Sequence, residues 1–316
     1  MLRLPAKHPS HKSPKLEAQM ITIGGIYYHK LTNIICMAFV DSLACKFHYT
    51  PFHLFCKLSP NLEPECVYTE LYNSDTFLKE HKKLQKQTCE PGCKLNQLVA
   101  TMMLWSDSTH LASFGNTSLW HIYCYFGNQS KYSHAKLSNY AAHHIVYIPS
   151  LPDTVREQYI MLLGYPPSLA VLTHLKSELM HAIWRLILNN EFLHSYKHGI
   201  VVSCTDGNEQ CLHPHILMYL ADYPEKVLLS TIQYLGQCPC PHCFILKWEI
   251  DGINTESDVK HTYVENLLKP TSMVPTCNAF SECLLDLGFE FHEVFVPNLL
   301  HKFKLGVWKA VFMHLL

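Results

Sequence analysis

Short apolar runs separated by turn residues mark the middle of the chain. Between Leu98 and Ser150 three runs rich in Val, Ile, Tyr and Phe follow one another: LVATMMLWSD, SLWHIYCYFGN and AAHHIVYIPS. Gly, Asn and Ser stand between them. Runs of this length and composition are typical of β-strands joined as hairpins. The pattern therefore predicts three successive strands.

A different periodicity follows the stop and cap formed by Pro166, Pro167 and Ser168. Leucine and isoleucine recur there at spacings of three and four, which predicts an amphipathic helix from Leu169 to about Tyr196. Gly199 ends it. The β-branched run at residues 200–205 then predicts a fourth strand, which leads into Asp206.

Two further helices are predicted after that strand, from about Pro214 to Leu220 and from Asp222 to about Tyr234. The second begins Asp-Tyr-Pro-Glu, which fits a capping box with proline in the first turn. Strand, strand, strand, helix, strand, helix is the RNase H arrangement. We therefore expect an α/β (α+β) fold, with an RNase H-like mixed sheet flanked by helices.

Five segments are expected along the chain. Residues 1–20 are polar and proline-rich and predict a disordered lead-in. Residues 21–95 form an N-terminal mainly helical or mixed segment, and residues 96–247 form the RNase H-like core. Residues 248–276 are a short insertion or linker, and residues 277–316 complete the core in truncated form.

Composition narrows the class of protein. Hydrophobic residues make up 48% and charged residues 16%, which favours a folded globular chain. The 25 basic residues balance 26 acidic ones, so no basic field indicates nucleic-acid binding. Fourteen cysteines without an apolar leader favour a reduced, intracellular chain, and no apolar run is long enough to predict a membrane span.

Long sequence blocks carry a family resemblance. WSDSTHLASFGNTSLWHIYCYFGNQSKY, AAHHIVYIPSLPDT, LTHLKSELMHAIWRLIL, YLADYPEKVLLSTIQYLGQCPCPHC and FVPNLLHKFKLGVWKAVFMHLL resemble, in this order, the body of the Plavaka transposases. The resemblance extends from Tyr27 to Leu316. These are CACTA-like cut-and-paste enzymes of fungal genomes. The resemblance implies transposon DNA as partner, action in the nucleus, and neither a membrane association nor a small-molecule cofactor.

The resemblance also implies a catalytic site. Such enzymes hold two Mg²⁺ or Mn²⁺ ions on three carboxylates, because these ions prefer hard oxygen ligands. Asp107 closes the first predicted strand and is the expected first acid. It could instead have a purely structural role and cap the turn that follows it. Asp206 follows the fourth strand and is our choice for the second acid. Asp222 is its competitor, and could instead be only a helix N-cap.

A cysteine motif lies between the second and third acids. Cys240 and Cys243 form a Cys-x-x-Cys knuckle that resembles the paired cysteines of the family, and two such thiolates can take adjacent corners of a zinc tetrahedron. His301 is the expected third ligand, with His242 and Cys238 as local alternatives. A reduced thiol pair without zinc is the other interpretation.

Three positions depart from the family. Asn298, Lys302 and Lys304 stand in the C-terminal block where the family carries acids. The insertion or linker at residues 248–276 is also shorter than in the family. The chain stops at Leu316 without the further residues and upstream DNA-binding fingers of full members. We therefore expect a transposase-derived protein that has lost activity.

Two alternatives remain open at this stage. The first is an active metal-dependent nuclease or phosphodiesterase, with Glu282, Asp286 or Glu293 as third acid. The second is a non-catalytic binding domain stabilised by zinc on Cys240, Cys243 and His301.

Overall fold

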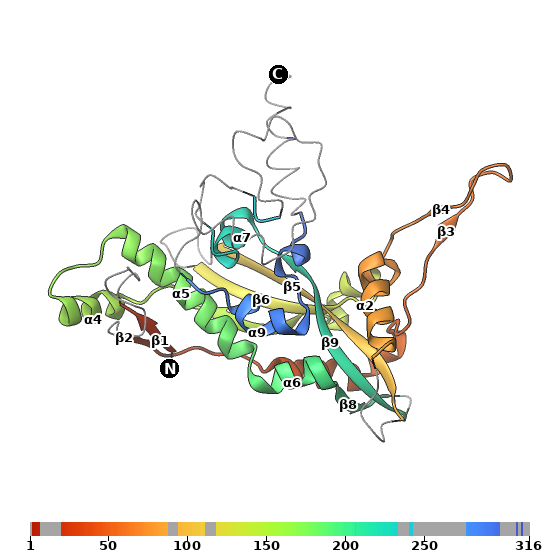
Figure 1. The fold of residues 1–316 in the computed structure, drawn as a ribbon, viewed down its shortest axis with the longest axis horizontal. Coiled ribbons are helices and arrows are strands. Elements are labelled where there is room, and N and C mark those ends of the chain that lie inside the picture. The colour runs from red at the N-terminus through yellow and green to blue at the C-terminus, as the bar shows by residue number, and fades with distance from the viewer. Residues whose placement is uncertain are drawn as a thin grey trace.

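A mixed five-stranded sheet organises the fold. The computed structural model describes residues 2–6, 20–87, 94–110, 118–205, 207–232, 240–242, 276–297, 308 and 311. The sheet consists of β5 (Asn96–His110), β6 (Ser118–Phe126), β7 (His143–Ile148), β8 (Ile200–Ser203) and β9 (Glu209–Leu220). Their order is β7-β6-β5-β9-β8, with β5 and β9 parallel and all other neighbours antiparallel. The protein is therefore a mixed α/β structure (Figure 1).

The predicted strands are confirmed, but one predicted helix is wrong. β5, β6, β7 and β8 fall on the four expected runs. Pro214 to Leu220, expected to be helical, instead lies in β9, where Pro214 pairs with Ala100. The last pair between β8 and β9 is Ile200 with Leu212, so β9 has a strand partner on only one side at Pro214. Proline is tolerated in such edge-like positions.

The helices that follow β7 are shorter than predicted. The expected long helix divides into α5 (Leu169–Ile187) and α6 (Asn190–His198), because the Asn189 side chain accepts a hydrogen bond from Phe192 N at 2.9 Å and caps a new helix. Gly199 ends α6 as expected, with a φ of +81°. α7 (Tyr223–Leu229) begins as predicted and ends five residues before Tyr234.

The N-terminal part is mixed in structure. Its elements are β1 (Leu2–Pro5), β2 (Met20–Ile23), α1 (Leu31–Val40), η2 (Ser42–Lys46), β3 (Phe55–Cys56), β4 (Glu65–Cys66), η3 (Leu71–Asn73) and α2 (Asp75–Gln85). The disordered lead-in is a wrong prediction for Leu2–Pro5, which pairs with β2 because Leu4 and Ala6 are fully buried. Residues 7–19 lie outside the described residues.

Short elements complete the described chain. They are α3 (Lys131–His134), η4 (Leu137–Asn139), α4 (Asp153–Leu163), α9 (Ala279–Leu284), η6 (Leu285–Leu287) and η7 (Phe291–Val294). Within the described residues we find no helix whose length and apolar character would let it cross a bilayer.

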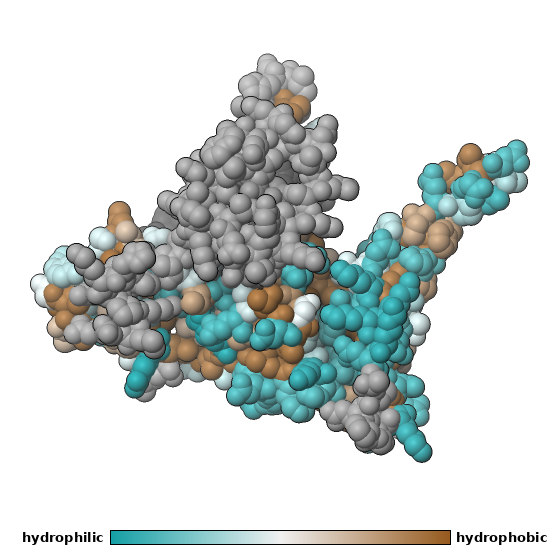
Figure 2. Space-filling model, in the orientation of Figure 1, coloured by the Kyte–Doolittle hydropathy of each residue, from teal (hydrophilic) through white to brown (hydrophobic). Residues whose placement is uncertain are grey.

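Helices cover the two faces of the sheet unequally. On one face α5 and α9 pack together, with the Trp184 ring 4.5 Å from that of Phe280 and 5.7 Å from that of Tyr219 (Figure 1). On the other face α2 packs Phe77 and Leu84 against Val99, near the start of β5. Hydrophilic residues dominate the surface over α2, and the β3–β4 hairpin projects away from the sheet (Figure 2).

A buried amide joins the sheet to the N-terminal part. Asn128 is fully buried, and its Oδ1 accepts hydrogen bonds from both N and Oγ1 of Thr101 at 2.8 Å. Its Nδ2 donates to Val99 O at 3.0 Å and to His48 O at 3.1 Å. All four hydrogen-bonding positions of the amide are therefore used.

Asn128→Ala should lower the free energy of unfolding by about 2 to 4 kcal/mol, because it leaves buried backbone groups unpaired. Urea denaturation measures this loss. Asn139→Ala is the matched control, since within the described residues the half-buried Asn139 amide donates to Ser133 O and Oγ. Equal losses in the two variants would contradict the role given to Asn128.

Candidate functional site

Asp107 and Asp222 lie at the same end of the sheet. The parallel pairing of β5 with β9 ends where Trp105 lies opposite Leu220. Asp107 comes two residues after Trp105, and Asp222 comes two residues after Leu220. Adjacent strands are about 4.8 Å apart, and alternate residues of a strand face the same side. The register therefore brings the two aspartates to one end of the sheet.

Asp222 is also the N-cap of α7. Its Oδ1 accepts a hydrogen bond from Glu225 N at 2.9 Å, and its backbone is extended, with φ −72° and ψ 170°. The helix N-cap that we gave as the alternative role of Asp222 is therefore confirmed. A carboxylate has about four acceptor sites, so one cap bond leaves capacity for a cation.

Asp206 lies outside the described residues, but the strand before it is described. Our choice of Asp206 assumed that the strand before it stands beside the first strand of the sheet. β9 occupies that place, whereas β8 is the edge strand beyond it. The last residue of β8, Ser203, pairs with Glu209 at the start of β9, far from Leu220. The topological argument therefore applies to Asp222.

A buried carboxyl group beneath this end of the sheet was missed by sequence reasoning. Glu225 accepts hydrogen bonds from the Ser106 hydroxyl and from Trp120 Nε1 at 3.2 Å, and Tyr219 Oη lies 3.3 Å away. The capping-box pattern located Glu225 at the start of a helix but assigned its side chain to the helix backbone. Three donors from three different strands hold it instead.

Burial sets the protonation of Glu225. Burial, joined by the nearby charge of Asp222, raises the pKa of the Glu225 carboxyl to about 8, against the lowering effect of its hydrogen bonds. Glu225 is 4% exposed, which agrees with burial as the main cause of the raised pKa. With a pKa of about 8, the Glu225 carboxyl group is mainly protonated at neutral pH.

The neighbouring Lys226 connects this site to the C-terminal segment. Its Nζ donates to Val296 O, while Val296 N donates to Tyr219 O at 3.3 Å. Phe295 forms a parallel bridge with Tyr219, so the described chain up to Pro297 runs toward the Asp222 end of β9. The following block, with Asn298, His301, Lys302 and Lys304, lies outside the described residues.

The three candidates for a third acid have other partners or surroundings. Glu282 forms an ion pair with Arg185 at 2.7 Å, and Glu293 forms one with Lys79 at 3.9 Å. Asp286 lines a cavity of about 330 Å³. The described contacts of these acids do not join them to Asp107 or Asp222. Within the described ranges no group of three His, Cys, Asp or Glu residues could hold a metal ion.

The cysteine knuckle is described only in part. Cys240 is half-buried, and its Sγ accepts a hydrogen bond from His242 N at 3.4 Å. The His242 ring packs against Phe295, with 5.8 Å between ring centroids. Cys238, Cys243 and His301 lie outside the described residues, so zinc binding stays a prediction.

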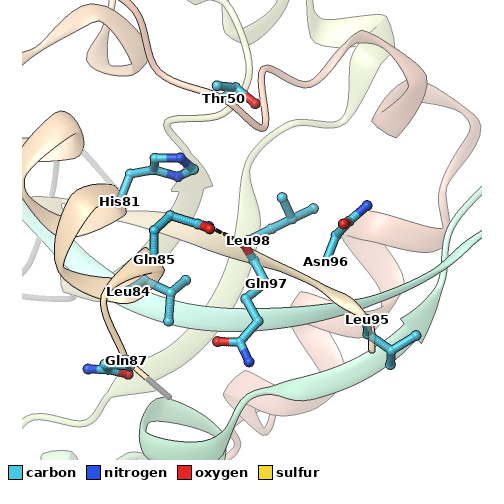
Figure 3. Close-up of a pocket in the computed structure, with 9 residues that line it drawn as sticks. All are labelled: Thr50, His81, Leu84, Gln85, Gln87, Leu95, Asn96, Gln97 and Leu98. Atoms are coloured by element: carbon cyan, nitrogen blue, oxygen red, sulfur yellow. Dashed lines mark hydrogen bonds between the residues drawn. The ribbon is translucent and has the colours of Figure 1, made fainter. Parts of the chain in front are cut away.

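A cavity of about 430 Å³ lies at the other end of β5 (Figure 3). Gln85 Nε2 donates to Gln97 O there at 3.0 Å. The lining contains no carboxylate and consists of Thr50, His81, Leu84, Gln85, Gln87, Leu95, Asn96, Gln97 and Leu98. Asn96 begins β5 and Asp107 stands near its end, so this cavity is separate from the aspartate pair.

Comparison with known families identifies the class of protein as a transposase. A family model described as Plavaka transposase matches residues 9–315, nearly the whole chain. The chain therefore belongs to the Plavaka transposase family. Neither the search of curated proteins nor the search of solved structures gives a significant match.

Substitutions at Asp222 should separate its cap from its charge. Asp222→Ala should lower the free energy of unfolding by about 1 kcal/mol, because α7 loses its N-cap. Asp222→Asn should change it little, because asparagine caps equally well. Chemical denaturation of both variants measures the difference. Equal losses would show that the charge, and not the cap bond, stabilises α7.

The raised pKa of Glu225 makes stability depend on pH. Between the ordinary value of 4.5 and about 8 the folded protein keeps a proton that the unfolded chain releases, so stability falls as pH rises. The slope for one proton is at most about 1.4 kcal/mol per pH unit. Glu225→Gln should lack this contribution. Urea unfolding of both proteins from about pH 5 to about pH 9 tests it; a constant difference between them would contradict it.

Proposed function

We propose that this chain derives from an RNase H-like transposase core whose metal site included Asp107 and Asp222. The parallel pairing of β5 with β9 carries the proposal, because it directs both aspartates to one end of the sheet. The order of elements supports the RNase H-like part of the proposal: three antiparallel strands β5, β6 and β7, then helices α4, α5 and α6, then the edge strand β8 and finally β9, which is parallel to β5. Family membership supplies the chemistry of DNA strand cleavage and joining.

The residues at this end fit a divalent cation. Mg²⁺ is commonly bound by one or two carboxylates together with substrate phosphates, and two aspartates meet that requirement. When bound, such ions activate the attacking oxygen and stabilise the leaving oxygen of a phosphodiester. Asp107 and Asp222 would hold the cation. The neutral Glu225 carboxyl would anchor the start of α7 to Ser106, the residue before Asp107.

We propose further that cleavage has been lost. Asn298, Lys302 and Lys304 stand where the family block carries acids, so carboxylates that the resemblance implies for a complete two-metal site are missing. Transposon DNA is then the ancestral partner and the nucleus the ancestral place of action. A structural zinc ion on Cys240, Cys243 and His301 belongs to the same proposal.

Binding of Mn²⁺ by purified protein should test the metal site. Wild-type protein should reduce the electron paramagnetic resonance signal of free Mn²⁺. Asp107→Asn and Asp222→Asn should weaken this effect about tenfold each, since each removes one charged ligand. Asp206→Asn is the matched control and should bind like wild type. Loss of binding in Asp206→Asn, with Asp222→Asn unaffected, would transfer the second ligand to Asp206.

Nicking of supercoiled plasmid with Mg²⁺ or Mn²⁺ tests the loss of activity. No nicking above the level of Asp107→Asn is expected. Metal-dependent nicking that Asp107→Asn abolishes would replace our proposal with an active nuclease. Stoichiometric zinc without Mn²⁺ binding would favour the zinc-stabilised binding domain.

A further inference from the structure

One face of the sheet carries a group of aromatic and imidazole rings beside Asp107. Trp105 pairs with Tyr123 across β5 and β6, and Asp107 pairs with His121. Directly opposite residues of an antiparallel pair project on the same face. We call this set the ring face: Trp105, His121, Tyr123, Tyr125, His144 and Tyr147.

The rings of this face lie in two contacting groups, one of Trp105 and Tyr125 and one that runs from His121 to Tyr147. The Trp105 and Tyr125 ring centroids are 6.5 Å apart, and those of His121 and Tyr123 are 4.6 Å apart. The surface continues from Tyr123 to His144 at 5.7 Å, and from His144 to Tyr147 at 3.9 Å. It therefore spans β5, β6 and β7.

Part of this surface is open to solvent. Trp105 is 48% exposed and Tyr147 is 40% exposed, although large aromatic side chains usually contribute to cores. α2 covers the same face of β5 at Val99, six residues before Trp105. On the described ring face, Nδ1 of His121 and Nε2 of His144 have no hydrogen-bond partner.

The ring face carries almost no charge. Strands β5, β6 and β7 contain no Lys or Arg, and Asp107 is their one acidic residue. A surface of this kind cannot attract duplex DNA by neutralising phosphates. Aromatic rings do stack on bases, and bases offer their faces only when they are unpaired.

We propose that the ring face binds unpaired DNA bases by stacking. The inference rests on the proposed function for its choice of DNA, and it adds the state of the DNA and the surface that holds it. Asp107 lies on the same face as Trp105, and Asp222 follows β9 at the same end of the sheet. A strand stacked on Trp105 and Tyr123 would run past the two aspartates, which positions its backbone at the metal site.

Fluorescence anisotropy tests the proposal with a labelled oligothymidine of about 20 nucleotides and the full chain, in a buffer with chelator. Leaving out divalent metal makes the result independent of the metal site. Trp105→Leu and Tyr123→Leu should each weaken binding about tenfold, whereas Trp105→Phe should keep most of it because a ring remains. A labelled duplex should bind more weakly than the single strand. The salt dependence of single-strand binding should be shallow.

Phe55→Leu is the matched control, because Phe55 is an exposed ring on the β3–β4 hairpin, away from the sheet. Single-strand binding that Trp105→Leu and Tyr123→Leu leave unchanged would overturn the proposal, as would tighter binding of duplex. Size-exclusion chromatography provides a further check: a dimer that Trp105→Leu dissociates would identify a second copy of the chain as the occupant. Mn²⁺ binding that persists in Trp105→Leu would show that the variant folds and that only the ring face is affected.

Discussion

The parallel pairing of β5 with β9 is the constraint on which the site depends. Asp107 and Asp222 are separated by more than a hundred residues, and the register of these two strands is what directs them to one place. Parallel strands need a long crossover connection, here the stretch that contains β6, β7, α5 and α6. A shift of one residue in this register would turn one carboxylate to the opposite face.

Glu225 makes that register specific. Its buried carboxyl group has donors on β5, β6 and β9, so the hydrogen bonds can form only when all three strands are in register. The same residue donates its backbone N–H to Asp222, and its neighbour Lys226 holds Val296. The start of α7 thus connects Asp222, the centre of the sheet at Ser106 and the segment before Asn298.

Local patterns in the sequence predicted the parts of the fold that local physics determines. The strand runs of β5, β6 and β7, the Ser168 cap of α5 and the Asp222 cap of α7 were all visible in the sequence. β9 was not, because Pro214 is typical of a helix start and only its place in the sheet makes it acceptable. Glu225 could not be predicted, since its partners Ser106 and Trp120 lie more than a hundred residues away. The choice between Asp206 and Asp222 as second acid depends on strand order, which is not a local property, and it stays a prediction.

We propose that Asp107 and Asp222 form one cation site. An anomalous difference map from crystals soaked in Mn²⁺ tests it most directly. We expect one peak within about 2.3 Å of a carboxylate oxygen of each aspartate. A peak at other carboxylates, or a separation of more than about 10 Å between the carboxyl groups of Asp107 and Asp222, would contradict the claim.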